Sequence, residues 1–552
     1  MENINMTNIP LEKLRFADPN RRTGDKKFDT KPMSYAKDVF IRFCKNKSSV
    51  VAAVIIVLLI LFAIFVPIFC ETTYTKSLTD TNYLRYQKLL PRAELFVGTG
   101  FWDGGSKETI NQNGYNTFKA IEAETGVPVI TKVYKDAYKN PPSATGEVDD
   151  TVYYDVRLDS YTKNGLMYVT LTKDQFHDIQ NWQNSTGIQV IYPAVNEEAT
   201  RKDENGFDVL DENGQPISLF PNASNHTNAN IWYVNDDKGL PILDENGDFQ
   251  PIYATTDEAK YTGPRYSAPY YTYDSLRVDG DDGSYIYAVV STTGSGETMT
   301  TSYKVRVSLY NYFHYKYGLE PSFLFGTNAK GQDILTRLAA GARFSLILAI
   351  CISAVNLFIG AMYGAVEGFY GGIIDLAMER VSDVLGGMPS MVVMSLFQLH
   401  LASKVGPVWS MVFAFILTGW LGMAARTRMQ FYRFKNQEYV LSARTLGASD
   451  GRLMFKHIFP NAMGTLITGS VLSIPGVIFS ESSLTYLGIV NLESSTQTSV
   501  GTLLSNGNGV LTTFPHIILF PALFISLLEI SFNLFGNGLR DAFNPSLKGI
   551  ED

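Results

Sequence analysis

The stretch EYVLSARTLGASDGRLMFKHIFP, Glu438–Pro460, separates two long runs that contain no charged side chain. The stretch itself is polar and helix-prone, and it contains Gly447, which can adopt the positive φ that ends a helix. The flanking runs, Val405–Ala425 and Ile458–Ser480, are long enough to cross a hydrocarbon layer that needs about 20 residues. A polar helical segment between two membrane spans is a place where another protein can bind and exert force on the spans.

Six such charge-free runs occur along the chain. The alternative, a large soluble protein with buried helices, rarely contains so many. The sequence therefore predicts an α-helical multi-pass membrane protein with six transmembrane helices. The six runs are Ser48–Cys70, Phe344–Val366, Val384–Ser403, Val405–Ala425, Ile458–Ser480 and Val510–Leu528.

Basic residues lie unevenly around these runs. The group Arg42, Lys45 and Lys47 precedes the first run, and the loop between the fourth and fifth runs carries several more. The loop between the fifth and sixth runs, Glu481–Gly509, has no Lys or Arg. Because Lys and Arg in short loops mark the cytoplasmic side, we expect both termini and Glu438–Pro460 inside the cell. No secretory signal opens the chain, and the first run is long enough to remain as an uncleaved anchor.

This topology divides the chain into five parts. The net charge of −8 comes from the acidic third part, so it indicates no preference for a charged partner, and nothing points to nucleic acid. The expected parts are a cytoplasmic tail at 1–47, transmembrane helix 1 at 48–70, an extracellular inserted domain at 71–325, a membrane core at 326–540 with helices 2–6 and a cytoplasmic loop at 426–460, and a cytoplasmic tail at 541–552.

The segment 71–325 has the composition of an ordered, mainly β (α+β) domain. Residues 151–158 and 284–290 alternate in the manner of half-buried strands. Residues 168–192 predict a strand, a helix and a strand in succession. The segment contains no cysteine, so disulfides do not hold it together.

Asp-Glu-Asn-Gly occurs three times in this segment, at 203–206, 211–214 and 244–247. Asn-Gly between apolar runs favours a hairpin, because type I′ turns need two positive φ angles. Calcium binding by these acidic turns is a weaker alternative, since they lack the alternating oxygen ligands and the closing Glu of a calcium loop.

The sequence contains no zinc-binding helix motif, no cysteine pair at metal spacing and no nucleophile elbow, and its six histidines are scattered. Gly326 and Gly331 have the spacing of a phosphate loop, but Gln332 and Asp333 stand where Lys and Ser or Thr would be needed. We therefore expect no enzyme activity and no metal, nucleotide or other cofactor bound by this chain.

Glycine and proline interrupt several of the apolar runs. Gly360, Gly364 and Gly368 recur every four residues, a spacing that lets helices pack closely. Interrupted helices can line a cavity for a solute, although an inert packed bundle contains them too. The prolines expected to break the third, fifth and sixth runs are Pro389, Pro475 and Pro521.

Glu529 lies in the apolar stretch ALFISLLEISFNLFG, and a carboxylate inside a membrane marks a functional or paired site by default. The alternatives are a position near the inner interface or a pairing with a partner subunit. Asn533 shares its helix face. Glu481 ends the fifth run on the outer side, where we expect it to meet water. The candidate residues for a translocation path are Glu529, Asn533, Pro389 and Glu481.

Residues 438–446 can form a short helix that Gly447 ends, and a second turn is expected at 450–457 before Pro460 opens the next span. One side of the helix would carry Tyr439, Ser442 or Ala443, and Leu446. The small residues Ser442, Ala443 and Ala448 would let another surface approach closely. The alternative is a plain cytoplasmic linker.

The second half of the chain resembles a known family. Leu441-Ser-Ala-x-x-x-Gly447 followed by His457-Ile-Phe-Pro460 is similar to the cytoplasmic "EAA" loop of bacterial ABC importer permeases. The wider sequence resembles the OppC/DppC-like subunit of oligopeptide and dipeptide permeases, densely over 323–548 and loosely over 37–70. Further matching segments are Phe-Gly-Thr…Gly…Asp at 325–333, Gly-Ala-Arg-Phe-Ser-Leu at 341–346, Phe-Tyr-Gly-Gly at 369–372 with Asp375, Pro389-Ser, Glu481-x-Ser-Leu-x-Tyr-Leu-Gly, and Phe-Asn-Leu-Phe-Gly-x-Gly-Leu-Arg-Asp at 532–541.

The chain also departs from the family pattern. Leu441 stands where the loop usually begins with Glu, and Glu529 falls where the family is usually apolar. The segment 71–325 is an insertion, and inserted versions of such subunits are familiar in Gram-positive-type bacteria.

The resemblance implies a type I ABC importer permease that translocates oligopeptides across a bacterial cell membrane. It also implies a second, OppB-like permease subunit, two OppD/OppF-like ATP-binding subunits that use ATP and Mg, and an extracellular peptide-binding lipoprotein. Competing interpretations are a membrane-anchored receptor acting through 71–325 and a permease for nickel or another small solute. The residues expected to dock on an ATPase are Glu438, Tyr439, Leu441, Ser442, Ala443, Arg444, Leu446, Gly447, Ala448, His457 and Pro460.

Overall fold

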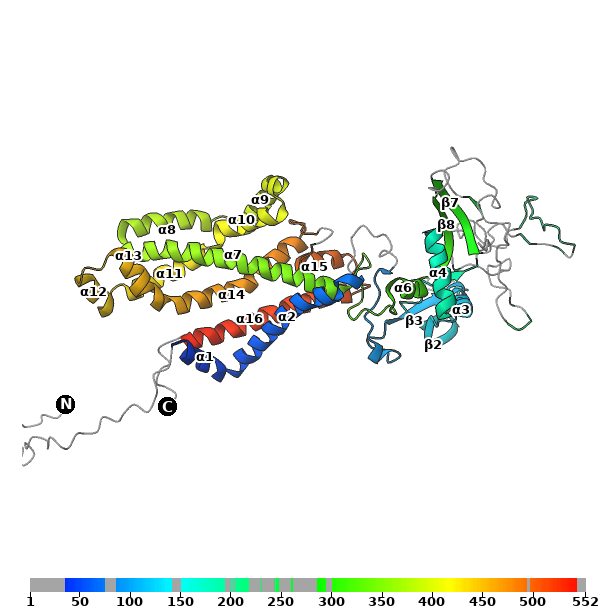
Figure 1. Cartoon of the computed structure of the whole chain (residues 1–552), viewed down its shortest axis with the longest axis horizontal. Coiled ribbons are helices and arrows are strands. Elements are labelled where there is room, and N and C mark those ends of the chain that lie inside the picture. The colour runs from blue at the N-terminus through cyan, green and yellow to red at the C-terminus, as the bar shows by residue number, and fades with distance from the viewer. Residues whose placement is uncertain are drawn as a thin grey trace, which may run out of the picture.

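The computed structural model shows a long helical bundle with two β-sheets beyond one of its ends (Figure 1). We call this end of the bundle the sheet end and the opposite end, where helix α12 lies, the α12 end. The structure describes residues 35–74, 86–140, 150–193, 200–201, 203, 205–217, 230, 243, 245–247, 260–261, 285–293, 300–493 and 497–543. The expected tails therefore lie largely outside the described residues.

Five helices in the described residues are long and apolar enough to cross a membrane, or six spans if one bent pair counts as a single span. This confirms a helical membrane protein. The first span agrees with the predicted run Ser48–Cys70. The five stretches are Lys47–Phe69 within α2 (Lys47–Tyr74), α7 (Ile334–Tyr370), Pro407–Phe434 formed by α10 (Pro407–Gly419) and α11 (Leu421–Phe434), Asp450–Tyr486, and α16 (His516–Phe543).

The predicted third run is not one straight helix. Helices α8 (Gly372–Gly386) and α9 (Ser390–Val405) meet at a bend of 72°. The break contains Pro389, as the sequence predicted, because proline lacks the N–H of a continuing helix and disfavours helical φ and ψ in the residue before it.

Two other proline predictions were wrong. Pro475 lies inside the continuous helix α14 (Phe459–Tyr486), and Pro521 lies inside α16. A membrane helix tolerates the loss of the one backbone hydrogen bond that proline removes, because neighbouring helices and local adjustments compensate for that loss. The predicted sixth run, Val510–Leu528, also began too early, since α16 starts at His516 after the separate helix α15 (Val500–Asn508).

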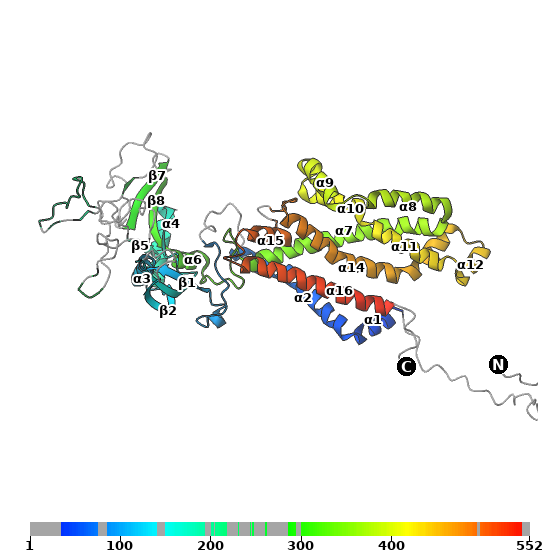
Figure 2. The same cartoon turned by 180° about the vertical axis from the view of Figure 1, so that it is seen from behind.

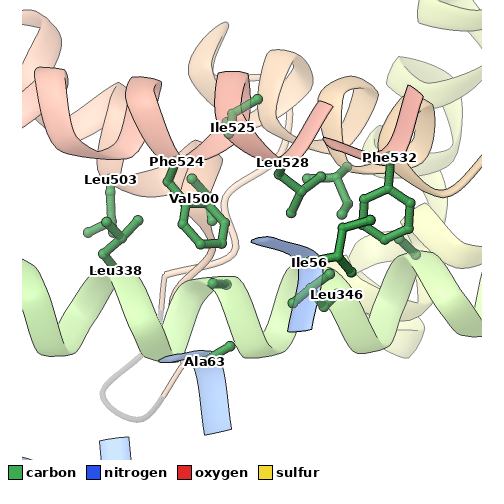
Figure 3. Packing of buried hydrophobic residues seen from close by; sticks show 13 residues of the cluster. Ile56, Ala63, Leu338, Leu346, Val500, Leu503, Phe524, Ile525, Leu528 and Phe532 are labelled. Atoms are coloured by element: carbon green, nitrogen blue, oxygen red, sulfur yellow. The ribbon is translucent and has the colours of Figure 1, made fainter. Parts of the chain in front are cut away.

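The core of the bundle lies where α2, α7, α15 and α16 meet, and Ile478 of α14 also belongs to it. Apolar side chains of α2, α7, α15 and α16 point toward one another there (Figure 3). Burial of such side chains removes apolar surface from water or lipid and packs it at the density of a protein interior. The labelled residues of this cluster are Ile56, Ala63, Leu338, Leu346, Val500, Leu503, Phe524, Ile525, Leu528 and Phe532.

The glycine repeat of α7 packs against α11, as its spacing predicted. A Cβ atom placed on Gly360 would lie 2.6 Å from the carbonyl oxygen of Trp420, and one on Gly368 would lie 2.7 Å from Cβ of Phe431. The two helix backbones therefore approach closely along this line, which only glycine allows.

Two small sheets form the other part of the molecule. The first has the order β1-β3-β2, with β1 (Gly105–Asn111) and β2 (Ile130–Lys139) both antiparallel to β3 (Val152–Asp159). Helix α3 (Gln112–Thr125) joins β1 to β2 and packs on this sheet. The strand predicted at 151–158 is therefore confirmed.

The second sheet has the order β4-β8-β7-β6, and β5 also pairs with β8. The predicted strand, helix and strand within 168–192 are β4 (Leu166–Thr172), α4 (Lys173–Thr186) and β5 (Ile191–Tyr192), and the strand predicted at 284–290 is β7 (Ile286–Thr293). The remaining elements are β6 (Lys260–Tyr261), β8 (Thr300–Ser308) and α6 (Leu309–Tyr317).

The two sheets share a repeated unit with an offset of 61 residues. In α3, one side-chain oxygen of Glu122 accepts hydrogen bonds from the backbone N–H groups of Val129 and Ile130 at 2.8 and 2.7 Å. In α4, the side-chain oxygen of Gln183 accepts equivalent bonds from Val190 and Ile191 at 3.2 Å each. Each helix ends at a glycine of positive φ, Gly126 or Gly187. The segment thus contains a strand–helix–strand unit twice.

Gly206, Gly214 and Gly247 of the Asp-Glu-Asn-Gly turns have positive φ, but the asparagine before each of them does not, so these are not the type I′ turns that were predicted. An isolated antiparallel bridge joins Leu210 to Pro216 across the second turn, as expected for a hairpin. Over the described residues, no group of three or more His, Cys, Asp or Glu side chains is arranged to hold a metal ion.

The sheets join the bundle through neighbouring strands of chain. The N–H of Arg92 donates to the carbonyl of Phe323 at 2.9 Å, and that of Lys88 to Asn328 at 3.1 Å. Asp333 then caps the first turn of α7, where burial raises the pKa of its carboxyl. The chain thus leaves and rejoins the bundle at almost the same point.

Candidate functional site

The stretch Glu438–Pro460 forms the α12 end of the bundle (Figures 1 and 2). Helix α12 (Glu438–Thr445) ends at Gly447, which has a φ of 82°. The N–H of Gly447 donates to the carbonyl of Arg444, and that of Ala448 donates to Ala443, both at 3.0 Å. This is the Schellman arrangement that ends many helices, and it confirms the predicted glycine stop.

The second predicted turn is also present. Helix α13 (Asp450–Arg452) continues through a π-helical segment, Leu453–Ile458, into α14. Pro460 lies in the first turn of α14, where its missing N–H costs little. Single π-helical turns are rare and occur frequently at functional sites.

One side of this loop packs against its own bundle. Val440, Leu453 and Ile458 are fully buried, in a cluster that also contains Phe431 of α11 and Phe369 of α7. The predicted contact residues Ala443 and Ala448 are half-buried in this cluster. Their small size therefore serves the inner packing of the loop as well as its outer surface.

The other side of the loop is exposed. Leu446 is 89% exposed, and Tyr439, Leu441 and Ser442 are exposed beside it. An apolar side chain so fully exposed at the tip of a polar loop is a contact candidate. The remaining predicted residues of this surface that are exposed are Glu438, Arg444, Gly447 and Pro460, whereas His457 is half-buried.

Two side chains fix this surface to the bundle. The amide nitrogen of Asn461 donates to the Tyr439 hydroxyl at 3.1 Å, and burial raises the pKa of that hydroxyl. The guanidinium of Arg444 lies 5.8 Å from the ring centre of Phe369. The exposed surface therefore has a defined conformation.

A charged cluster behind the loop was not foreseen from the sequence. Arg428 of α11 donates to Asp375 and Glu379 of α8 at 2.9 and 2.8 Å, and its Nε lies 3.7 Å from Glu367 of α7. The Tyr432 hydroxyl also donates to Asp375. One guanidinium thus ties three helices together, and such charge-assisted bonds are strong.

Lys435 extends this connection to the start of the loop. Its ammonium donates to the carbonyl of Gly368 at 2.9 Å and lies 4.3 Å from the ring centre of Tyr432. Burial lowers the pKa of this lysine. The segment that leads into α12 is therefore joined by short contacts to α7 and α11.

The sequence contained a signal for this cluster. Asp375 and Glu379 are four residues apart, and this spacing places them on one face of a helix. Glu367 directly follows the predicted run Phe344–Val366. Their partner Arg428 comes from a distant segment, so the pairing itself could not be read from spacing.

Glu481 does not meet water, so that prediction was wrong. It is only 1% exposed, and its carboxylate accepts hydrogen bonds from the hydroxyls of Ser345 at 3.0 Å and of Ser482 and Thr485 at 3.3 Å. It is therefore enclosed by hydroxyl groups of α7 and α14 rather than exposed in a path.

Glu529 and Asn533 lie together on α16, as their spacing predicted. Asn533 is exposed, and its amide donates to the backbone carbonyl of Glu529 at 3.0 Å. Glu529 is half-buried in the middle of the helix.

A cavity of about 190 Å³ opens between α9, α10 and α14. It lies next to the bend at Pro389, because the adjacent Ser390 lines it, and it lies beside Glu481 through Ser480 and Ser483. Glu529 and Asn533, on α16, are not among its lining residues. The other lining residues are Met391, Met394, Phe415, Thr418, Gly419, Phe479 and Leu484.

Two family models match the chain. The family described as "Binding-protein-dependent transport system inner membrane component" matches residues 356–549. The family described as "N-terminal TM domain of oligopeptide transport permease C" matches residues 34–91. The matches lie on either side of the two sheets.

Several characterised proteins are similar to the chain. The oligopeptide transport system permease protein OppC of Bacillus subtilis is 40% identical over 224 residues, which are 41% of this chain and 72% of the relative. The dipeptide permease DppC of the same organism is 38% identical, over 41% of this chain and 69% of the relative. OppC of Haemophilus influenzae is 36% identical, over 41% and 71%.

A solved structure of a methionine ABC transporter in an inward-facing conformation covers 37% of this chain and 96% of its own. The sequence identity is 12% and the TM-score is 0.30.

Proposed function

Since this chain belongs to the permease family of binding-protein-dependent ABC importers, we propose that it carries peptides across the membrane as the OppC/DppC-like subunit. It is a membrane-spanning permease subunit of an ATP-binding cassette importer. Peptides are the solutes named for its OppC and DppC relatives. The relatives are transport permeases, which disfavours the alternative of a membrane-anchored receptor.

We propose a coupling role for the loop Glu438–Pro460 because of its exposed surface. Leu446 and Tyr439 stand outward from a helix whose inner side is fixed by buried packing and the Schellman turn. Such a surface fits a groove on an ATPase subunit, with contact through shape and apolar area in place of the acidic residue that Leu441 replaces. ATP and Mg would be used by the partner.

The charged cluster supports a route for the motion. When two ATPase subunits close, each pushes on the loop that it holds, and the loop moves with α7, α8 and α11 because Arg428 and Lys435 tie them together. Alternation between inward-facing and outward-facing states would follow from movement of these helices as a unit.

The rest of the assembly follows from the same proposal. The α12 end and both termini would lie in the cytoplasm and the sheets, part of an insertion at 71–325, outside a Gram-positive-type bacterial cell. The partners would be a second, OppB-like permease subunit, two OppD/OppF-like ATPases and a peptide-binding lipoprotein. Nickel or another small solute remains an alternative to peptides. Mass spectrometry of the solute held by the co-purified binding protein would decide between them.

We propose that the cavity between α9, α10 and α14 is this subunit's half of the solute path. At about 190 Å³ it is smaller than typical ligand sites of ~300–1,000 Å³, as expected if a second permease subunit completes it. Ser480→Phe should block uptake without loss of ATPase binding, whereas Ser526→Phe, on an exposed position of α16, should not. Equal uptake by the two variants would contradict the proposal.

Gly447→Val tests the docking surface. Valine is strained at a φ of 82°, so α12 should lose its stop and uptake should fall strongly while the subunit remains in the membrane. Gly451→Val is the matched control, because Gly451 lies four residues away, has an ordinary φ and has open space around it.

Leu446→Ser provides a second test that leaves the backbone unchanged. It should reduce co-purification of the ATPase subunits, whereas Leu319→Ser, at an exposed leucine near the sheet end, should not. Normal peptide uptake and normal ATPase binding by both Gly447→Val and Leu446→Ser would exclude docking at this loop.

A further inference from the structure

A short loop beside the bundle exposes a concentrated set of large apolar side chains. We call residues Glu94–Trp102, with the sequence ELFVGTGFW, the apolar tip. Leu95 is 86% exposed and Phe101 is 63% exposed, and Phe96 and Val97 are also exposed. Glu94 is the one charged residue in the tip. Exposed apolar patches of this kind mark surfaces that contact a membrane or another protein.

The apolar tip is held in one conformation. At its base, the N–H of Ala93 donates to the carbonyl of Trp102 at 2.8 Å, and that of Gly104 donates to Pro91 at 3.0 Å. Thr99 closes the turn, since its hydroxyl donates to the carbonyl of Phe96 at 2.7 Å. Exposure of the apolar side chains is therefore built into a defined turn.

An ion pair secures this turn to the first sheet. Nε of Arg157 on β3 donates to the carboxylate of Asp103 at 3.1 Å, and Nη2 of Arg157 donates to the carbonyl of Gly100 at 3.1 Å. The carboxylate of Asp103 also accepts from the N–H groups of Gly100 and Gly105, each at 3.0 Å. The base of the tip is thus joined to β3 of the first sheet.

The position of the tip indicates what covers it. The ring of Trp102 lies 5.6 Å from that of Phe520, in the first turns of the membrane-spanning helix α16, and 6.5 Å from that of Phe325. Phe325 stacks on Phe520 with centroids 4.1 Å apart, and Phe101 packs on Trp102 at 5.3 Å. The apolar surface of the tip is therefore continuous with a helix that lies in the membrane.

In both views the tip, in the blue segment between α2 and β2, lies to the side of the sheet end of the bundle (Figures 1 and 2). Trp102 has the geometry of an interfacial anchor, with an apolar ring against α16 and an indole N–H that donates to the carbonyl of Leu324.

We propose that the apolar tip inserts into the head-group region of the membrane leaflet at the sheet end, with Leu95, Phe96 and Phe101 among the lipid chains and Trp102 at the interface. The insertion holds the sheets at a fixed height and tilt above the bilayer. It goes beyond the transport role and depends only on the membrane position of α16.

The test uses the full chain in the assembled transporter, reconstituted into lipid vesicles. In a background in which Cys44, Cys70 and Cys351 are serine, a single cysteine is introduced by Leu95→Cys and labelled with a fluorophore. Phe207→Cys is the matched control, since Phe207 is also apolar and is 71% exposed, and it lies on a hairpin where its N–H donates to the Asp203 carboxylate. Emission is compared in vesicles with and without lipids brominated on the acyl chains.

We expect bromolipid to quench the label at position 95 severalfold more than the label at position 207. The same quenching at both positions, or at neither, would overturn the proposal. If the label at 95 is shielded only after the solute-binding protein is added, and not by lipid, then a protein partner covers the tip and the membrane proposal is wrong. A second test measures hydrogen exchange of the backbone amides of the tip in lipid vesicles. We expect faster exchange in the double variant Leu95→Asp/Phe101→Asp than in the wild type. Equal exchange rates would also overturn the proposal.

Discussion

Glu481 shows how far a residue's role depends on chain that is distant in sequence. It lies at the end of an apolar run, where a carboxylate ordinarily reaches water. In the structure, α14 continues to Tyr486, and Ser345 of α7 closes over the carboxylate. The partner is 136 residues away in sequence, so no local pattern could have predicted the burial.

We predict that Glu481→Ala lowers the stability of the subunit by about 1–3 kcal/mol, because buried hydroxyl donors lose their acceptor. Glu481→Gln should cost less, since its amide oxygen still accepts from Ser345. The measurement is the melting temperature of the purified subunit in detergent. Melting temperatures for Glu481→Ala at or above wild type would show that the carboxylate does not hold α7 to α14.

At the same scale, Gly447 was predicted correctly because the cause is local. A positive φ at the end of a helix favours glycine regardless of the rest of the fold. Which of its neighbours lie inward and which lie outward was not predictable in this way. Ala443 and Leu446 are both small or apolar, and only the packing of Val440, Leu453 and Phe431 determines that Ala443 lies inward and Leu446 outward.

Among the elements, two glycines of membrane-spanning helices differ in the space that a Cβ atom would have. Gly360 faces the carbonyl oxygen of Trp420, so Gly360→Ala should force the helices apart at a cost of about 1–3 kcal/mol. Gly476, within α14, has open space where a Cβ would lie, so Gly476→Ala should stabilise the helix by about 0.5–1 kcal/mol.

These opposite signs are measurable as melting temperatures of the two variants in detergent, with uptake assays as a second readout. A fall for both variants would mean that the space around Gly476 is not open to a Cβ atom in the folded subunit. A rise for both would contradict the close approach at Gly360.

The repeated strand–helix–strand unit was within reach of the sequence. Thr-Gly-Val-Pro-Val-Ile at 125–130 and Thr-Gly-Ile-Gln-Val-Ile at 186–191 match at the same offset as Glu122 and Gln183. The helix predicted at 173–183 was therefore one of a pair. The first copy is harder to predict from the sequence because its strands alternate weakly, and β2 in particular is largely exposed.

The bend between α8 and α9 shows that membrane-spanning helices cannot always be predicted from uncharged runs. The charges of α8, which include Asp375 and Glu379, excluded it from every run, so the predicted third span began at Val384, near the end of that helix. Arg428 pairs with the carboxylate of Asp375, and Lys435 donates a hydrogen bond to a backbone carbonyl of α7. These contacts allow the charged helix α8 to pack in the bundle.

For the whole molecule, the two ends of the bundle should be separable. The predicted experiment replaces residues 95–318 with a short Gly-Ser linker, which is feasible because Arg92 and Phe323 are hydrogen-bonded neighbours. Since α12 lies at the opposite end, the truncated chain should bind the ATPase subunits in the same ratio as the intact chain (Figure 1). Co-purification and quantification of the ATPases measure this.

Loss of ATPase binding on this deletion would show that the sheets are needed for folding or assembly. Binding-protein-dependent uptake then separates the remaining roles of the sheets. Undiminished uptake would favour an insertion without a transport role, whereas lost uptake with retained ATPases would indicate docking of the binding protein or covering of the path. Leu446→Ser in the intact chain is the converse control.

The sheets have a practical consequence for imaging. A permease bundle inside a detergent micelle presents few features that distinguish one orientation from another. Here a folded, off-axis mass extends from one end of the bundle, and the ion pair between Arg306 and Glu124, both almost fully buried, joins β8 to α3 across its two sheets. Single particles of the assembled transporter should therefore align on the chain's own polypeptide, without an added antibody fragment.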